Sequence, residues 1–143
     1  MLIPYLTFKD PAAAMALYEK ALGAKSTMVM DGPYDSIMHA EMEVAGQTFM
    51  LSCEWPGMAT APKEGERSPV NFMVYVENAD AAYDTAISAG MTSVQAPEDM
   101  FWGDRNAKVS DGHGYEWTLA HKVEELSAEE INTRAAAFAA SME

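Results

Sequence analysis

The stretch that decides the fold is residues 5–25, YLTFKDPAAAMALYEKALGAK, in which a short apolar run leads directly into a helical pattern. Asp10 is a good N-cap, Pro11 suits the first helical position, and Gly23 stands where helices commonly end in a left-handed residue. Apolar side chains recur at the spacing of one buried helix face: Ala14, Leu17, Tyr18, Ala21 and Leu22. The stretch therefore predicts a strand followed by a helix.

The same pattern returns in the second half of the chain, where Asn78 takes the place of Asp10 as the cap and Gly90 ends the helix. Three strand candidates follow each helix. They are residues 24–30, 37–45 and 47–55 in the first half and 92–97, 105–111 and 115–122 in the second. A duplicated module explains this repetition. We therefore predict an α+β protein with two tandem strand–helix–strand–strand–strand (βαβββ) modules.

The boundaries of the modules follow from composition. Residues 57–68 are rich in Pro, Gly and charge, which is typical of a linker. We expect one domain over residues 1–123, with module one at 1–56 and module two at 69–123. Residues 124–143 predict a helical tail, because Ser127 begins a capping box and an apolar stripe follows it. That stripe must pack either on its own domain or on a partner subunit.

The net charge and the composition limit the kinds of molecule that we expect this protein to bind. A formal net charge of −13 repels phosphate backbones and anionic lipids, so we expect no nucleic acid and no membrane partner. No apolar run approaches the roughly 18 residues that span a bilayer, and no secretory pattern opens the chain. A cytoplasmic protein is expected. The single cysteine, Cys53, excludes an intrachain disulfide and is expected either as a small buried strand residue or as a reactive thiol.

Four segments carry a resemblance to a known family: YLTFKDPAAAMALYEKALGAK, HAEMEVAGQTFMLSCEW, VYVENADAAYDTAISAGM and FWGDRNAKVSDGHGYEWTLAHK. Together they resemble the vicinal oxygen chelate superfamily, and within it the PhnB-like proteins of the glyoxalase/bleomycin resistance type. The resemblance implies a glyoxalase/bleomycin resistance fold, in which the two modules form an open, barrel-like cleft. It also implies that the cleft lies within a homodimer and takes a small-molecule ligand.

Enzymes of this superfamily typically hold a divalent metal between the first and fourth strands of each module. Carried onto this sequence, those places are Ile3 and Met50 in module one, and Asn71 and Thr118 in module two. These four residue types are poor ligands for such a metal. We therefore expect no metal site and no cofactor, while a displaced site at His39 and Glu41 stays open as an alternative.

The alternation of side chains along strands predicts which residues line the cleft. His39 and Glu41 are weak candidates for general acid/base groups, or else solvated polar positions on a half-exposed sheet. Arg105 either meets an anionic group at the rim of the cleft or braces Asp104. The expected ligand contacts are Tyr5, Met50, Ser52, Glu54, Asn71, Met73, Trp102, Arg105 and Thr118.

These residues suit a small amphiphilic organic molecule. The resulting hypothesis is a protein that binds such a molecule in its cleft without the usual metal. The alternative is a metal-dependent lyase, isomerase or dioxygenase of the same superfamily.

Overall fold

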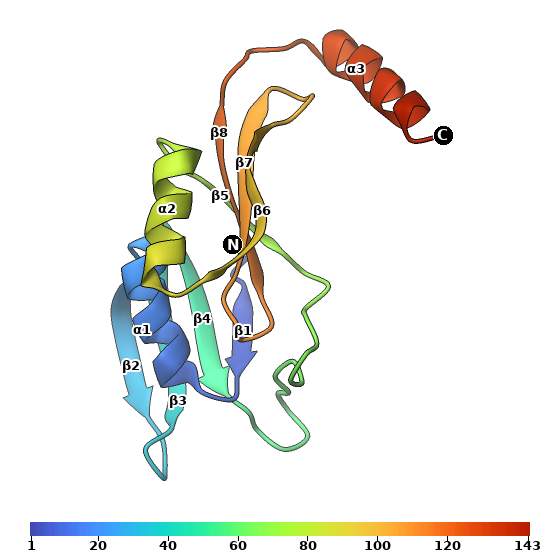
Figure 1. Ribbon diagram of the computed structural model, residues 1–143. Helices are drawn as coiled ribbons and strands as arrows, with labels where there is room; N and C mark the ends of the chain where they lie inside the picture. Colours follow the sequence, from blue (N-terminus) through green and yellow to red (C-terminus); the bar gives the residue numbers. More distant parts are fainter.

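A computed structural model describes residues 1–143 and has the expected tandem arrangement (Figure 1). Module one contains β1 (Tyr5–Phe8), α1 (Pro11–Leu22), β2 (Lys25–Asp31), β3 (Ile37–Val44) and β4 (Gln47–Cys53). Module two contains β5 (Phe72–Tyr75), α2 (Ala79–Ala89), β6 (Thr92–Asp99), β7 (Asp104–Ser110) and β8 (Glu116–Lys122). The last element is α3 (Ala128–Ser141). The α+β fold class, with two βαβββ modules and a C-terminal helix, is confirmed.

Local sequence signals set the ends of the two central helices. The Asp10 side chain accepts a hydrogen bond from the Ala13 N–H, and the Asn78 side chain accepts one from the Ala81 N–H. Both helices end in a left-handed glycine, with a φ of 66° at Gly23 and 116° at Gly90. A glycine adopts this conformation without steric cost, so each helix stops where the sequence predicts.

Each module forms a four-stranded sheet, in the order β1-β4-β3-β2 in module one and β5-β8-β7-β6 in module two. The first strand pairs in parallel with the fourth, and the other pairs are antiparallel. Tyr5 pairs with Met50 in module one, and Met73 pairs with Thr118 in module two. The two sheets therefore share one register, and residues at matching places in them can be compared directly.

The two modules share one hydrophobic core. Trp117 of β8 joins them, because its ring centroid lies 5.1 Å from that of Tyr18 on α1 and 5.8 Å from that of Phe49 on β4. The helices α1 and α2 also pack side by side (Figure 1). The sheets thus meet through their helix-covered sides, and their other faces are turned away from the shared core. They do not close on one another within one chain.

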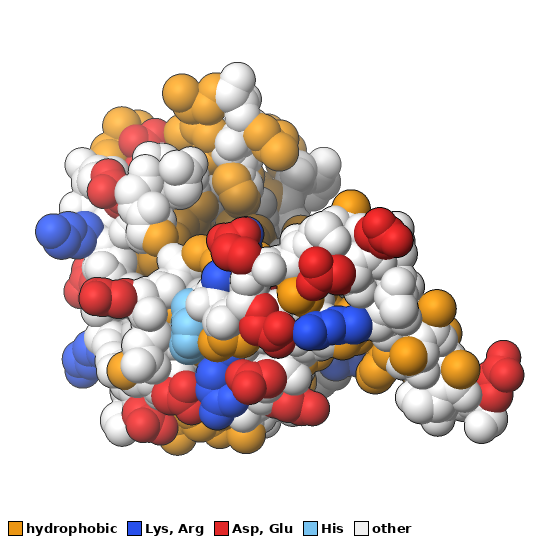
Figure 2. Space-filling model, turned by 90° about the horizontal axis from the view of Figure 1, so that it is seen from above, with side chains coloured by type: hydrophobic (Ala, Val, Ile, Leu, Met, Phe, Trp, Pro, Cys, Tyr) orange, Lys and Arg blue, Asp and Glu red, His pale blue; other side chains and the backbone are white.

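The C-terminal helix α3 extends away from this core and has no buried residue. It contacts the β6–β7 turn, where the Phe138 ring lies 5.1 Å from the Phe101 ring and Arg134 donates to the Phe101 carbonyl. Hydrophobic side chains are exposed along the helix (Figure 2), and Phe138 is 51% exposed. No helix in the chain has the length and apolar content needed to cross a bilayer.

Candidate functional site

The uncovered face of module one carries a chain of three polar side chains. The Tyr5 hydroxyl lies 2.7 Å from Nδ1 of His39, and Nε2 of His39 lies 3.5 Å from a carboxylate oxygen of Glu41. With the ring hydrogen on Nε2 directed to Glu41, Nδ1 accepts the Tyr5 hydroxyl proton. An imidazole held between a phenol and a carboxylate is able to relay a proton.

Strand register explains why these side chains meet. Tyr5 pairs with Met50, and Met50 pairs with Glu41, so the three form one row across β1, β4 and β3. His39 lies on the same face as Glu41, two residues away along β3, where the Tyr5 side chain reaches it diagonally. Met50 is thereby enclosed between the phenol and the carboxylate.

Two further residues of module one that we expected to contact a ligand already have hydrogen-bond partners within the chain. Ser52 is 1% exposed, and its hydroxyl donates to the Cys53 carbonyl at 2.9 Å. Glu54 accepts a hydrogen bond from the Ala61 N–H at 3.0 Å and so holds the linker. Both side chains therefore take part in hydrogen bonds that support the fold when no ligand is bound.

The uncovered face of module two has a different polar set. Met73, Thr118 and Lys108 form the row that matches Tyr5, Met50 and Glu41 in module one. Beside this row, the Tyr75 hydroxyl donates to Asp104 at 2.7 Å. The hydrogen bond to Asp104 raises the pKa of Tyr75, because the neutral phenol is the donor and a phenolate would face a carboxylate.

Sequence reasoning missed the most unusual residue on this face. Asn106 is 7% exposed, and its side-chain oxygen Oδ1 is buried without any hydrogen-bond partner. Nearby, Glu116 lies 3.6 Å from Lys108 and 3.3 Å from Arg67. The signal in the sequence is the alternation of side chains along β7, which predicts that Asn106 and Lys108 lie on the uncovered face.

An apolar groove of about 450 Å³ borders the face of module two. Nine of its twelve lining residues are hydrophobic, and Met73 and Tyr75 of β5 take part in both the groove and the uncovered face. Other lining residues include Leu2, Pro4, Phe49 and Trp117. Seven of the twelve lining residues come from module one, so the groove lies between the two modules and adjoins the polar face of module two at β5.

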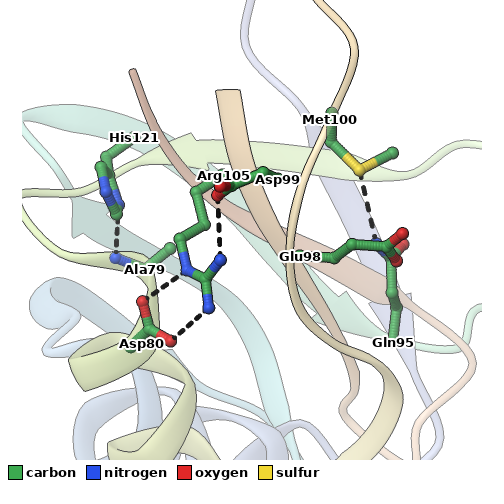
Figure 3. A network of polar contacts seen from close by, with 8 residues as sticks. All are labelled: Ala79, Asp80, Gln95, Glu98, Asp99, Met100, Arg105 and His121. Atoms are coloured by element: carbon green, nitrogen blue, oxygen red, sulfur yellow. Dashed lines mark hydrogen bonds and ion pairs between the residues drawn. The ribbon is translucent and has the colours of Figure 1, made fainter. Parts of the chain in front are cut away.

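Arg105, which we expected at the rim of the cleft, lies beside the first turn of α2 (Figure 3). Arg105 points to the helix side, where Nε and Nη2 contact the two oxygens of Asp80 at 2.7 and 3.0 Å, and Nη1 contacts Asp99 at 2.9 Å. This pairing raises the pKa of Arg105 and lowers that of Asp80. The expected brace between Asp104 and Arg105 is not formed, because successive strand residues point to opposite faces.

Two other residues at this end have local partners. Trp102 packs edge-on against Phe101 in the β6–β7 turn, with ring centroids 4.9 Å apart. Nδ1 of His121 accepts a hydrogen bond from the Ala79 N–H at 2.8 Å, which satisfies a free donor at the start of α2 (Figure 3). His121 is thus a capping residue of α2.

The residues that we expected to contact one ligand therefore lie in separate places on the two sheets. Tyr5, Met50 and Ser52 lie together on the face of module one, and Met73 and Thr118 lie together on the face of module two. Asn71 is exposed just before β5. Within one chain these groups do not share a cleft, because the groove between the modules includes Met73 but none of Tyr5, Met50 and Ser52.

The residues at the superfamily's metal positions do not fit a divalent metal. Met50 and Thr118 lie at matching places on β4 and β8, while Ile3 and Asn71 precede β1 and β5. None of these side chains carries an imidazole or a carboxylate. No group of three or more His, Cys, Asp or Glu side chains is arranged to hold a metal ion.

Paired βαβββ modules with uncovered sheet faces define the structural class of this protein. The family model of the Glyoxalase/Bleomycin resistance protein/Dioxygenase superfamily matches residues 4–119, and the chain belongs to this superfamily. The uncharacterized protein Mb0911c of Mycobacterium bovis is 35% identical over 134 residues, which cover 91% of this chain and 88% of that protein.

Solved structures show the same fold. The crystal structure of the Arabidopsis thaliana gene product At5g48480 superposes with a TM-score of 0.70 at 26% identity, over 85% of this chain and 98% of that one. The fosfomycin resistance protein FosX of Listeria monocytogenes has a TM-score of 0.68 at 13% identity, over 92% of this chain and 96% of that one. At 13% identity, the similarity to FosX shows a shared fold and nothing further.

Proposed function

We propose that this chain is a PhnB-like member of its superfamily that binds a small organic molecule on its uncovered strand faces, without the superfamily's usual metal. The observation that carries the proposal is the set of residues at the four metal positions: Ile3, Met50, Asn71 and Thr118. Aliphatic, thioether, amide and hydroxyl groups there suit contacts with an organic ligand better than coordination of a divalent ion.

The groove beside β5 also supports binding of a small molecule. Its volume of about 450 Å³ lies within the range of roughly 300–1,000 Å³ typical of ligand pockets. The groove is mostly apolar, and Tyr75 connects it to the polar side chains of module two. A ligand with an apolar part and a polar part matches this combination.

We further propose that a second copy of the chain completes the binding cleft. Each uncovered face exposes large side chains, with Tyr5 at 53%, Met73 at 48% and Tyr75 at 54% exposure. Glu41 and Lys108 occupy matching places in the two sheets and carry opposite charges. A homodimer that sets module one of one copy against module two of the other pairs these charges and brings the two groups of expected contacts into one cleft.

Charge reversal tests the homodimer. Sedimentation equilibrium of the wild type is expected to show a dimer, and Glu41→Lys is expected to weaken it because Lys108 of the other copy then meets a like charge. Adding Lys108→Glu to Glu41→Lys is expected to restore the dimer. Glu19→Lys, at an exposed position on α1, is the matched control. A monomeric wild type, or a double variant as weak as the single one, contradicts this arrangement.

Elemental analysis tests the metal-free proposal. Protein purified without added metal is expected to contain no stoichiometric Zn, Ni, Mn or Fe, and none of these ions is expected to raise its melting temperature. One tightly bound divalent ion per chain would overturn the proposal. A screen of small organic molecules by thermal shift then identifies ligands, and chemical-shift mapping locates them on the strand faces.

The Tyr5–His39–Glu41 chain favours a second candidate, an enzyme that transfers a proton with His39 and a carboxylate. Such an enzyme would exchange a hydrogen next to a carbonyl group in D₂O, which NMR detects for a panel of small carbonyl compounds. His39→Gln is expected to abolish the exchange while the protein stays folded. If the wild type exchanges no compound faster than buffer does, this candidate fails.

A further inference from the structure

Asn106 carries a polar atom whose burial has no structural explanation within the chain. Its oxygen Oδ1 is fully buried and accepts no hydrogen bond. Most buried polar atoms in folded proteins are paired, and an unpaired one costs on the order of 1–3 kcal/mol. A hydrophobic residue would avoid that cost at this place on β7. The oxygen is therefore a candidate acceptor for a group that comes from outside the chain.

The surroundings of Asn106 favour a hydrogen-bond donor. In the sheet register, Tyr75, Ala120 and Asn106 form one row, and Ala120 in its middle has only a methyl side chain. Asp104 lies on the same face two residues away, and Glu98 is the registered neighbour of Asn106 on β6. Carboxylates on both sides make this end of the face attractive to an N–H or O–H group.

The other end of the same face favours an anion. Lys108 lies 3.6 Å from Glu116, and Arg67 lies 3.3 Å from the other oxygen of Glu116. Within one chain two cations share one carboxylate there, which leaves a local excess of positive charge in a chain whose net charge is −13. In the proposed homodimer, the carboxylate of a bound ligand takes the place of Glu41 of the other copy beside Lys108. Thr118, the registered neighbour of Lys108, adds a hydroxyl group.

We infer that the face of module two binds a small carboxylic acid that also carries an N–H group. Lys108 and Arg67 attract the carboxylate, Asn106 Oδ1 accepts the N–H, and Met73 with the adjoining groove receives an apolar substituent. An N-acylated apolar amino acid has these three parts. The inference rests on the proposed function, because it names the ligand class of that same cleft.

Three matched compounds test the inference on the full chain. N-acetylleucine has both the carboxylate and the N–H, N-acetyl-N-methylleucine lacks the N–H, and N-acetylleucinamide lacks the charge. Backbone amide NMR titration is expected to show N-acetylleucine shifting the resonances of Asn106, Lys108 and Thr118. Each of the other two compounds is expected to bind about tenfold more weakly, the effect of losing one hydrogen bond or ion pair of about 1.4 kcal/mol.

Variants assign the two recognition elements. Asn106→Leu is expected to bind N-acetylleucine and its N-methyl analogue equally, and Asn106→Asp, which keeps an acceptor, is expected to retain the preference. Lys108→Gln is expected to reduce the preference for the carboxylate over the amide. Asn132→Leu, at an exposed place on α3, is the control, and melting temperatures verify that each variant is folded.

The outcomes separate this inference from the proposed function. Equal binding of the three compounds, shifts confined to residues outside this face, or no binding of any of them overturns the inference. The proposed function survives those results if other compounds from the thermal-shift screen shift resonances on the strand faces. It fails as well if no compound does.

Discussion

Arg105 forms a bidentate ion pair with Asp80, in which Nε and Nη2 lie 2.7 and 3.0 Å from the two carboxylate oxygens. This ion pair links β7 to the first turn of α2. A bidentate contact of this kind fixes orientation as well as distance. The carboxylate also lies near the positive end of α2, where a negative charge is favourable. The clamp gives Arg105, the last residue of the Gly-Asp-Arg sequence at residues 103–105, a structural role on the helix side of the sheet.

Asp80→Asn is expected to lower the melting temperature at neutral pH, with a difference from the wild type that shrinks in acid. Arg105 lowers the pKa of Asp80 in the folded state. The stabilisation is therefore present above the ordinary aspartate pKa of about 3.9 and is lost as the pH falls through the lower folded pKa. Thermal unfolding of both proteins from neutral pH into acid measures this difference.

The control for this prediction is Asp84→Asn, because Asp84 is exposed on the same helix. It is expected to change the melting temperature little at any pH. A difference between wild type and Asp80→Asn that stays constant from neutral pH into acid would contradict the assigned role of the carboxylate.

Tyr18→Phe is expected to destabilise the protein by about 1–3 kcal/mol. The Tyr18 side chain is fully buried, and its hydroxyl donates to Asp111, which is itself 3% exposed. Burial is the main reason why the pKa of Tyr18 is raised well above its usual value. Removing the hydroxyl leaves a buried carboxylate with one donor fewer at the junction of the two modules.

Urea unfolding measures how much Tyr18→Phe lowers the free energy of unfolding. Tyr83→Phe is the matched control, since Tyr83 is half-buried on the equivalent helix of module two. Equal stability of Tyr18→Phe and the wild type would show that the remaining donors to Asp111 suffice. Those donors are the N–H groups of His113 and Tyr115 and the Trp117 indole.

Gly114→Ala is expected to be more destabilising than Gly112→Ala. Both glycines have a left-handed φ, 97° at Gly114 and 74° at Gly112, so both alanines carry the same kind of backbone strain. A Cβ at position 114 would lie 2.5 Å from Pro62 Cβ, whereas a Cβ at 112 meets nothing within 4 Å. The linker must therefore move in Gly114→Ala, at an added cost of about 1–3 kcal/mol.

Two measurements check the glycine pair. Urea unfolding compares the free energies of unfolding, and limited digestion with trypsin reports the exposure of Lys63 in the linker. Gly114→Ala is expected to be cleaved faster than Gly112→Ala. Equal stability and equal cleavage in the two variants would mean that the contact between Gly114 and Pro62 does not hold the linker.

Asp104→Asn is expected to lower the pKa of Tyr75 toward the ordinary tyrosine value of about 10. In the folded protein Asp104 raises it, chiefly by accepting the Tyr75 hydrogen bond. The neutral phenol thus stabilises the fold below the ordinary tyrosine pKa, and this contribution is lost as the pH rises through the higher folded pKa. Ultraviolet absorbance of the phenolate follows the titration.

The difference between the titration curves of the wild type and Tyr75→Phe isolates the signal of Tyr75. If that signal titrates at the ordinary tyrosine pKa of about 10 in the wild type, the hydrogen bond to Asp104 is not formed in solution.

Sequence reasoning succeeded where the decisive interactions are local. The N-caps Asp10 and Asn78 and the left-handed Gly23 and Gly90 act within one turn of their own helices, and the structure has all four as predicted. Alternation also assigned Met50 and Met73 to the faces away from the helices. These features depend on neighbours a few residues apart, whose geometry is the same in any fold.

The same reasoning failed for Arg105 and did not single out Asn106. The Asp80 that binds Arg105 is 25 residues away on another element, so the adjacent Asp104 was the only partner that local reasoning suggested. The unpaired oxygen of Asn106 results from the packing of neighbouring strands around it. Neither property can be read from the nearby sequence.

The sequence by itself determined the two βαβββ modules, their caps and the side chains that each strand offers to each face, because propensity and periodicity act over short distances. Only the tertiary structure decided how the modules meet. Trp117 packs on Tyr18 and Phe49, and this contact joins the helix-covered sides of the two sheets into one core. Tyr5 and His39 on the sheet of module one, and Asn106 on the sheet of module two, therefore lie on the faces turned away from that core, since long-range burial of apolar surface sets which faces remain open.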